Sequence, residues 1–179
     1  MVADSRTELA RDITGKCRLT GSFTVRSGQT VTEYFDKYLF ESDPQLLRRV
    51  AEAMRPLVPD QTELLGGLEL GGIPIVTMLS SLTGLPALFV RKTAEEYGTC
   101  RLAEGADVAG RRVTLVEDVV TTGGAVRDAT RALREAGASV ETVVCAIDRS
   151  PTPGEALADV GLATLALFTR ADLDAARQG

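Results

Sequence analysis

Two adjacent carboxylates, Glu117 and Asp118, stand between an apolar run and a loop that reads Thr-Thr-Gly-Gly. A helical pattern then begins at Ala125. The backbone N–H groups and the positive end of a helix N-terminus favour a phosphate. The two acids would repel that phosphate, and they are better suited to sugar hydroxyls or to a metal ion. The segment 113–125 therefore predicts a ligand that carries a phosphate at one end and a diol beside it.

Two other loops hold residue types that suit a polyanion. Gly71-Gly72 follow an apolar run, and the polar segment 91–108 begins with Arg91-Lys92. Loops of that length inside a compact domain are uncommon unless they are functional or disordered. Each loop also has a simpler interpretation: a tight turn for the glycine pair, a solvated charge cluster for the cations, and a helix-capping or solvated pair for Glu117-Asp118.

The bulk composition limits the classes of function. The chain has 179 residues, which suits a single domain, and its net charge is −5 from 20 basic and 25 acidic residues. This balance argues against a broad nucleic-acid surface. The chain has no histidine, and its three cysteines are far apart in the sequence. We therefore expect neither a zinc site nor the histidine base that enzymes commonly use near neutral pH. The N-terminus lacks the apolar core of a signal peptide, and no apolar run approaches the roughly 18 residues of a membrane span, so a reduced cytoplasmic location is expected.

Apolar periodicity supplies the elements that must position these residues. Ser42, with Gln45 three residues later, predicts the start of a helix, and Gly137 predicts the end of another. The pattern predicts helices over 4–14, 43–54, 73–82, 125–136 and 170–177, a helical stretch near 153–159, a hairpin over 22–36 that turns at Ser27-Gly28, and strands over 64–70, 85–90, 112–117, 140–147 and 163–168.

The alternation of strands and helices predicts an α/β fold with a mainly parallel central sheet flanked by helices. Ligands in such sheets bind beyond the carboxyl ends of the strands. The three loops that begin at 71, 91 and 121 all open at that edge, so they can share one ligand.

Several segments together resemble the type I phosphoribosyltransferases, and specifically the orotate phosphoribosyltransferases. The segment 113–125 resembles the family's motif for phosphoribosyl pyrophosphate (PRPP). The other similar segments are Phe23 to Gly28, Tyr34-Phe35-Asp36, Gly71-Gly72-Ile73-Pro74, Arg91-Lys92 with Tyr97-Gly98, and Ile147-Asp148-Arg149. The resemblance spans roughly residues 20–150. It implies a single phosphoribosyltransferase domain over 1–179, with an N-terminal helix and hairpin hood over about 1–42 and a core over about 43–179.

The resemblance also implies a role for each matching residue. Glu117 and Asp118 would hold the ribose hydroxyls, and Arg91 and Lys92 would contact pyrophosphate. The implied PRPP-binding residues are Gly71, Gly72, Arg91, Lys92, Glu117, Asp118, Val119, Val120, Thr121, Thr122, Gly123, Gly124 and Ala125. The implied orotate-binding residues are Arg26, Tyr34, Phe35, Thr121 and Arg149. The implied catalytic residues are Glu117, Asp118, Arg91 and Lys92, to which we add Arg101 below.

The activity that the resemblance implies is transfer of the 5-phosphoribosyl group from PRPP to orotate in pyrimidine (UMP) synthesis. Magnesium would be held mainly through PRPP, with no direct protein ligand. A cytoplasmic homodimer with a shared active-site loop is also implied, and neither a nucleic acid nor a membrane is an expected partner. Orotate is already an anion near neutral pH, so the lack of a histidine base is consistent with this chemistry.

Three positions depart from the family pattern. Glu95 stands where a catalytic loop lysine is usual, Tyr97 where a histidine is usual, and Gly71 where some members have a lysine. An acid at position 95 would repel pyrophosphate. Arg101 lies further along the same loop, and we hypothesise that it substitutes for the missing lysine.

Three alternatives remain open at the level of sequence. The first is the same fold acting on another base, such as a purine, although Arg26 and Arg149 suit an anionic base better. The second is a non-catalytic PRPP- or nucleotide-binding regulator, which Glu95 favours. The third is a generic α/β nucleotide-binding domain, which would not explain the N-terminal hairpin.

Overall fold

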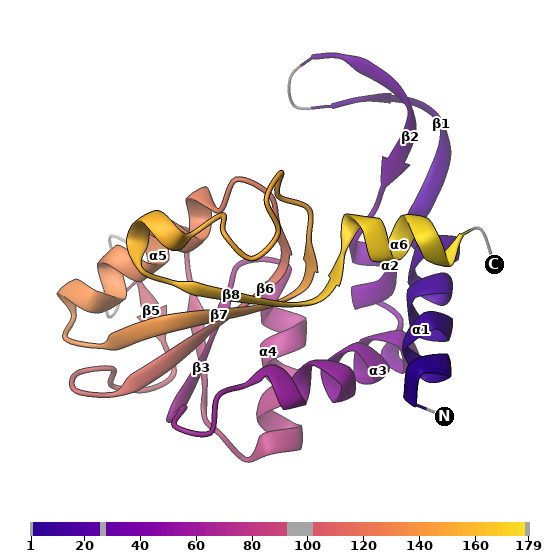
Figure 1. Ribbon diagram of the computed structural model, residues 1–179. Helices are drawn as coiled ribbons and strands as arrows, with labels where there is room; N and C mark the ends of the chain where they lie inside the picture. The colour runs from indigo at the N-terminus through magenta and orange to yellow at the C-terminus, as the bar shows by residue number, and fades with distance from the viewer. Residues whose placement is uncertain (1, 26–27, 93–101, 178–179) are drawn as a thin grey trace.

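A computed structural model describes residues 2–25, 28–92 and 102–177, with side chains from residue 5 onward (Figure 1). The helices are α1 (Val2–Cys17), α2 (Tyr38–Glu41), α3 (Pro44–Met54), α4 (Gly72–Thr83), α5 (Gly124–Glu135) and α6 (Arg170–Ala176), with 3-10 turns η1 (Arg55–Leu57) and η2 (Ala158–Val160). The strands are β1 (Arg18–Thr24), β2 (Thr30–Phe35), β3 (Leu64–Leu68), β4 (Ala87–Val90), β5 (Ala103–Glu104), β6 (Arg112–Val120), β7 (Ser139–Asp148) and β8 (Ala163–Thr169).

The larger sheet has the strand order β5-β4-β3-β6-β7-β8. Every pairing in it is parallel except that of β4 with β5. The inner strands are covered on both faces, so all five residues of β3 are buried and β6 is buried from Val113 to Asp118. The predicted mainly parallel sheet is therefore confirmed.

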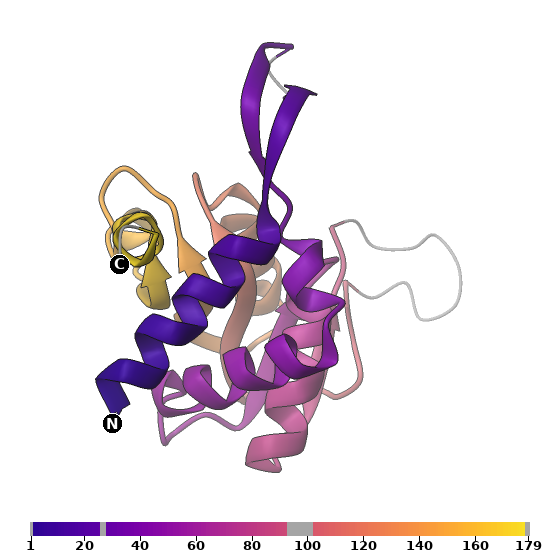
Figure 2. The same ribbon diagram turned by 90° about the vertical axis from the view of Figure 1, so that its right-hand side faces the viewer.

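Helices cover both faces of this sheet, and each face has its own apolar core (Figure 1). On one face, α1, α3 and α4 pack around residues such as Ile13, Val50 and Leu79, and Figure 2 shows these three helices together. On the other face, α5 packs around residues such as Leu115 and Leu133. Both β3 and β6 contribute residues to these two cores, so the two strands are held firmly. The loops that follow them therefore begin at fixed positions.

The N-terminal segment adds an antiparallel hairpin, β1 with β2, that projects from the body of the protein (Figures 1 and 2). Its base is anchored because α1 packs against both α3 and α6, and the Arg6 guanidinium lies 4.9 Å from the centre of the Phe168 ring. Gly28, at φ +83°, supports the predicted turn, since this conformation favours glycine. The proposed boundary between hood and core near residue 42 stays a prediction.

Several predicted boundaries were wrong. The N-cap of α3 is Asp43 and not Ser42, because its Oδ1 accepts the N–H groups of Gln45 and Leu46 at 2.9 and 3.1 Å. Of the helical stretch predicted near 153–159, residues 153–157 form turns and only the end is helical, as the 3-10 turn η2. The predicted 91–108 loop contains the short strand β5.

The largest difference concerns β6. It continues three residues past the predicted end at 117, because its backbone keeps pairing with β7 as far as Val120 opposite Asp148. The two carboxylates therefore lie inside the strand and not beyond its end.

Candidate functional site

The two carboxylates of β6 are buried in the ligand-free protein. Glu117 is 9% exposed and Asp118 is 1% exposed. Glu117 Oε1 accepts the N–H of Asp118 at 3.0 Å, and Asp118 Oδ1 accepts the N–H of Val119 at 2.6 Å. These local bonds satisfy backbone donors at the strand end and hold the acids in defined positions.

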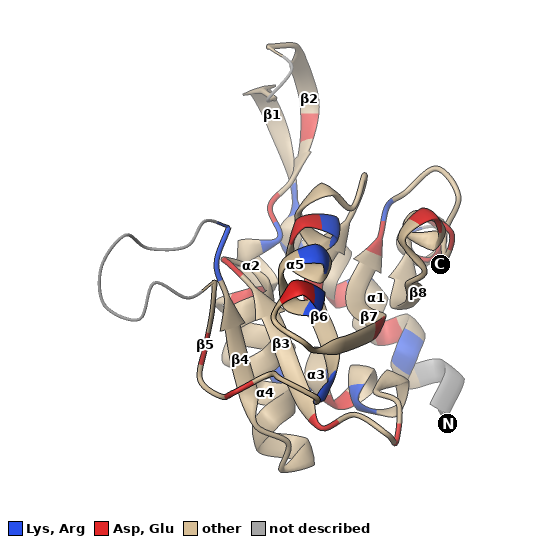
Figure 3. Ribbon diagram, turned by 90° about the vertical axis from the view of Figure 1, so that its left-hand side faces the viewer, with Lys and Arg blue, Asp and Glu red and all other residues tan. Residues whose placement is uncertain are grey.

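Asp118 also meets two side chains that the sequence analysis did not single out. Lys37 immediately precedes α2, and its Nζ forms an ion pair with Asp118 Oδ2. Glu41, the last residue of α2, is 6% exposed and faces the same carboxylate. Figure 3 shows that both signs of charge occur along the α2 segment and along the adjoining strand ends. Nothing in the local sequence pattern links residues 37 and 41 to a carboxylate some 80 residues away, so only the fold reveals this cluster.

The cluster does not carry a full negative charge on every acid. Burial, aided by the neighbouring Asp118 carboxylate, raises the pKa of Glu41 and the pKa of Glu117 to about 9 each. Burial also acts on Asp118, but the influence of the neighbouring Glu117, Glu41 and Lys37 side chains outweighs it and lowers the pKa of Asp118. Burial opposes the charge of Lys37 as well, yet its bond with Asp118 raises the pKa of Lys37. Near neutral pH, Asp118 is therefore the anion and Lys37 its counter-ion.

The chain reversal between β3 and α4 passes directly against Asp118. A Cβ added to Gly71 would lie 1.7 Å from Asp118 Oδ2 and 3.0 Å from Glu41 Oε1. One added to Gly72 would lie 2.5 Å from the Val116 carbonyl oxygen. Glycine at 71 and 72 thus lets the backbone approach β6 closely. The same clash means that a lysine would not fit at position 71 beside Asp118.

If the substrate is PRPP, as the sequence analysis expects, replacing Gly71 by alanine should lower kcat/KM for it about 100-fold, because misplacing a group of the site by about 1 Å costs that much. Gly71 has φ −69°, so the substitution adds a clash with Asp118 and no backbone strain. Gly15→Ala is the matched control, since a Cβ there meets nothing within 4 Å. Steady-state kinetics with a melting temperature for each variant would check this. Normal kinetics in Gly71→Ala would mean that the position of Asp118 is unimportant.

The loop after β6 leads into the N-terminus of α5 as predicted. Thr121 and Thr122 are exposed, and Gly123 caps α5 with φ +73°, a left-handed conformation that favours glycine. Arg127 on α5 donates to the carbonyl oxygen of Thr122 and, at 2.6 Å, to that of Ala156. These hydrogen bonds of Arg127 hold the loop in place, while Thr121 and Thr122 stay exposed. Val120 is 1% exposed, so its side chain belongs to the core and only its backbone is near the site.

A cavity of about 500 Å³ lies between the N-terminus of α5 and the predicted cations Arg91 and Lys92. Arg91 and Lys92 line it from the end of β4, opposite Gly124 and Ala125 on α5. The Lys92 N–H donates to Glu69 Oε1 at 2.6 Å, which ties this segment to the loop after β3. The structure therefore brings together the three loops that the sequence placed at one sheet edge.

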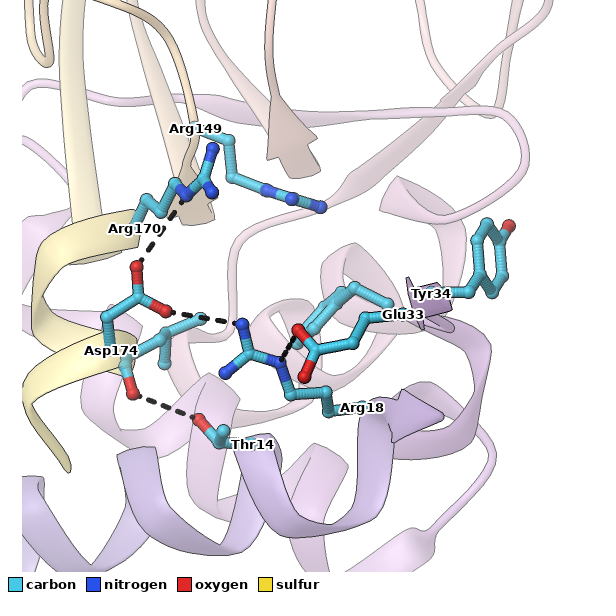
Figure 4. Close-up of a pocket in the computed structure, with 9 residues that line it drawn as sticks. Thr14, Arg18, Glu33, Tyr34, Arg149, Arg170 and Asp174 are labelled. Atoms are coloured by element: carbon cyan, nitrogen blue, oxygen red, sulfur yellow. Dashed lines mark hydrogen bonds and ion pairs between the residues drawn. The ribbon is translucent and has the colours of Figure 1, made fainter. Parts of the chain in front are cut away.

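Three of the predicted base-binding residues, Tyr34, Phe35 and Arg149, line a separate pocket of about 150 Å³ between the hood and α6 (Figure 4). Thr121, predicted to bind the base as well, is not among the residues that line it. The Arg149 guanidinium lies 5.5 Å from the centre of the Phe35 ring, whereas Tyr34 points away from the arginines. Asp148, fully buried, accepts the N–H groups of Ser150 and Gly154 at 2.9 and 2.8 Å and so shapes the turn that carries Arg149.

Two arginines that the sequence analysis missed share this pocket. Arg18 pairs with Glu33 at 3.1 Å and with Asp174 at 3.5 Å, and Arg170 pairs with Asp174 at 3.6 Å. Among the described residues, no carboxylate lies within 4.0 Å of the Arg149 guanidinium. Partial burial and repulsion from Arg170 and Arg18 lower the pKa of Arg149. The pocket therefore has positive charge available for an anionic ligand.

Some predicted residues lie outside the described residues: Arg26, Glu95, Tyr97, Gly98 and Arg101. Within residues 2–25, 28–92 and 102–177, no helix has the length and apolar character needed to cross a bilayer. The same part of the chain contains no cluster of three or more acidic, cysteine or histidine side chains arranged to hold a metal ion.

Comparison with known proteins places this geometry in a family. The family model "Phosphoribosyl transferase domain" matches residues 40–160. The chain is 73% identical to an orotate phosphoribosyltransferase of Nocardioides sp. over 170 residues, which cover 95% of each protein. The crystal structure of Mycobacterium tuberculosis orotate phosphoribosyltransferase with inorganic phosphate aligns with a TM-score of 0.84 and 30% identity, covering 96% of this chain and 99% of that one. A structure of the M. tuberculosis protein with PRPP aligns with a TM-score of 0.80 and 30% identity, covering 95% and 99%.

Proposed function

Because the chain belongs to the orotate phosphoribosyltransferases of the phosphoribosyltransferase family, we propose that the site described above transfers the 5-phosphoribosyl group of PRPP to orotate. The products are orotidine 5′-monophosphate and pyrophosphate, in the synthesis of UMP. The observation that carries this proposal is the convergence of three groups at one sheet edge: the buried acids, the open helix end, and the Arg91-Lys92 cations.

The ligand fits this site in one direction. Its 5′-phosphate lies against the backbone N–H groups from Thr121 to Ala125, at the positive end of α5. Its ribose hydroxyls face Glu117 and Asp118. Its pyrophosphate extends toward Arg91 and Lys92 in the cavity of about 500 Å³. In this orientation of the ligand, Glu117 and Asp118 face the ribose and not the phosphate groups at its two ends. This avoids repulsion between these carboxylates and the phosphates.

The charges of the site suit the transition state of the transfer. When the bond from the anomeric carbon to pyrophosphate breaks, positive charge develops on the ribose and negative charge on the leaving group. The Asp118 carboxylate stabilises the first, and the Arg91 and Lys92 side chains stabilise the second. Orotate attacks through a ring nitrogen, and the proton that this nitrogen loses passes to solvent or to the departing pyrophosphate, so the transfer balances without a side-chain base.

Magnesium fits this site as an ion carried by the substrate. The described residues hold no group of three metal-binding side chains, and Mg²⁺ is commonly bound through substrate phosphates and water, with few protein ligands. When bound with the substrate, it would neutralise charge on the leaving group. The protein residues that face this end are Arg91 and Lys92.

The pocket around Arg149 supports orotate over a neutral purine. Arg18 and Arg170 are paired with Glu33 and Asp174, which leaves Arg149, among the described residues of the pocket, as the cation that can meet a ligand. A neutral base does not need this guanidinium group, whereas the orotate carboxylate can accept from it and the orotate ring can stack near Phe35. Arg26 and the loop residue Arg101 keep their proposed roles toward orotate and pyrophosphate. We also propose a cytoplasmic homodimer in which part of the loop that begins at Arg91 serves the neighbouring site.

A direct assay tests the activity. Purified protein is mixed with Mg²⁺, PRPP and orotate, and orotate absorbance is followed, with adenine replacing orotate in a parallel reaction. We expect the orotate signal to fall only when all components are present, and no product from adenine. Binding of PRPP without turnover would instead identify a non-catalytic regulator, the outcome that Glu95 favours.

A further inference from the structure

Glu41 is a buried acid whose side-chain oxygens lack hydrogen-bond donors among the described residues. It is 6% exposed. A buried carboxylate without donors is costly, so such a group normally has a partner or carries a proton. No role in the transfer reaction has been assigned to it above.

The position of Glu41 is fixed by the fold. Phe40, which precedes it, is fully buried in the core, and the N–H of Ser42, which follows it, donates to the Tyr38 carbonyl at 2.9 Å. Glu41 Oε1 and Asp118 Oδ2 both lie within 3.0 Å of one point, the place that a Cβ on Gly71 would occupy. The two carboxyl groups therefore face each other across the glycine.

Two ionised carboxyl groups cannot hydrogen-bond, because each offers only acceptors. A proton between them converts this repulsive contact into a strong hydrogen bond. Lys37 pairs with the same oxygen of Asp118, Oδ2, and this ion pair favours the negative charge on Asp118. The shared proton therefore belongs to Glu41. The remaining ionisable neighbour in the cluster is Glu117, whose raised pKa also keeps it neutral near pH 7.

We propose that Glu41 is a positioning residue for the transfer reaction: as a neutral acid it donates a hydrogen bond to Asp118, and together with Lys37 it holds that carboxylate ionised and aimed at the ribose of PRPP. This inference rests on the proposed function, because it assigns Asp118 to the ribose. Glu41 itself touches no substrate. Its effect reaches the reaction through the orientation and charge of Asp118.

Two substitutions at Glu41 separate this role from simple packing. Glu41→Gln keeps the shape and an N–H donor but cannot ionise, and Glu41→Ala removes the donor. Near pH 7.5 we expect alanine to raise the KM for PRPP about 10-fold, the usual effect of leaving one buried partner unsatisfied. Glutamine should restore most of this loss. Glu8→Gln, at an exposed position of α1, is the matched control.

The pH dependence supplies a readout that a packing role would not change. Burial and the Asp118 charge raise the pKa of Glu41 to about 9, so at pH 9.5 the wild-type side chain ionises against Asp118. We expect the KM for PRPP to rise between pH 7.5 and 9.5 more in wild type than in Glu41→Gln. Glu117 and Lys37 titrate in both proteins, so the difference between the two isolates Glu41.

Unfolding gives a second readout that needs no substrate. Between pH 4.5, the ordinary pKa of a glutamate, and about 9, the folded protein keeps the Glu41 proton and the unfolded chain loses it. The stabilisation that Glu41 contributes at low pH is therefore lost as pH rises through this window. Urea unfolding at pH 6 and 8.5 should show a smaller loss of stability in Glu41→Gln than in wild type.

The outcomes distinguish the two proposals. If wild type neither binds PRPP nor consumes orotate, the proposed function fails. If wild type is active and Glu41→Ala has the same KM and kcat, or if Glu41→Gln loses as much as Glu41→Ala at pH 7.5, the positioning role is overturned. Rescue by glutamine together with a flattened alkaline rise in KM would establish it.

Discussion

Replacing Asp118 by asparagine should lower kcat for phosphoribosyl transfer about 1,000-fold, the upper range for removing one preorganised electrostatic contact. Asp118 is 1% exposed and is the acid of the cluster whose pKa is lowered, so its negative charge is present at working pH. Asparagine keeps the shape but cannot stabilise the positive charge that develops on the ribose. It also leaves Lys37 without its ion-pair partner.

Steady-state kinetics with varied PRPP and saturating orotate would measure the Asp118→Asn effect. The loss should appear mainly in kcat, because the charge on the ribose develops only in the transition state. Asp60→Asn, at an exposed turn, is the matched control and should behave as wild type. A melting temperature for each protein separates loss of catalysis from loss of folding. If the folded variant kept a kcat within threefold of wild type, Asp118 would not be the stabilising anion.

Replacing Arg149 by methionine should raise the KM for orotate about 100-fold and leave PRPP binding nearly unchanged. Loss of a desolvated, hydrogen-bonded charge partner typically costs about 2–5 kcal/mol, and about 2.7 kcal/mol corresponds to 100-fold. The Arg149 guanidinium lies beside Phe35 and, among the described residues, has no carboxylate partner, so it can pair with a ligand. Methionine keeps much of the apolar stem and removes the charge.

Two titrations check the Arg149→Met result. Orotate is varied at saturating PRPP, and PRPP binding is measured separately without orotate. Arg48→Met, an exposed arginine of α3, is the control. If the affinity of Arg149→Met for PRPP fell as much as its KM for orotate rose, the substitution would have disturbed the whole site. An unchanged KM for orotate would assign recognition of the base to other cations of the pocket, Arg18 and Arg170.

The segment 113–125 was interpretable from sequence because its elements are local. An apolar strand, two acids, a glycine turn and a helix start follow one another, and each carries a period or a turn signal that needs no distant partner. The parallel sheet followed from the same local signals and is confirmed by the strand pairings. The end of β6 did not follow, because pairing with β7 extends a strand past the point where its own pattern becomes polar.

Local sequence determined the residue types at the sheet edge and the order in which the chain presents them: cations, acids and phosphate loop. Tertiary structure alone decided which charges those acids carry. Lys37 and Glu41 reach Asp118 only because the segment around α2 packs over the Gly71 turn, and the Arg149 pocket forms only where the hairpin meets α6. The physical reason is that pKa values and pocket charge depend on burial and on neighbours distant in sequence, which no local pattern records.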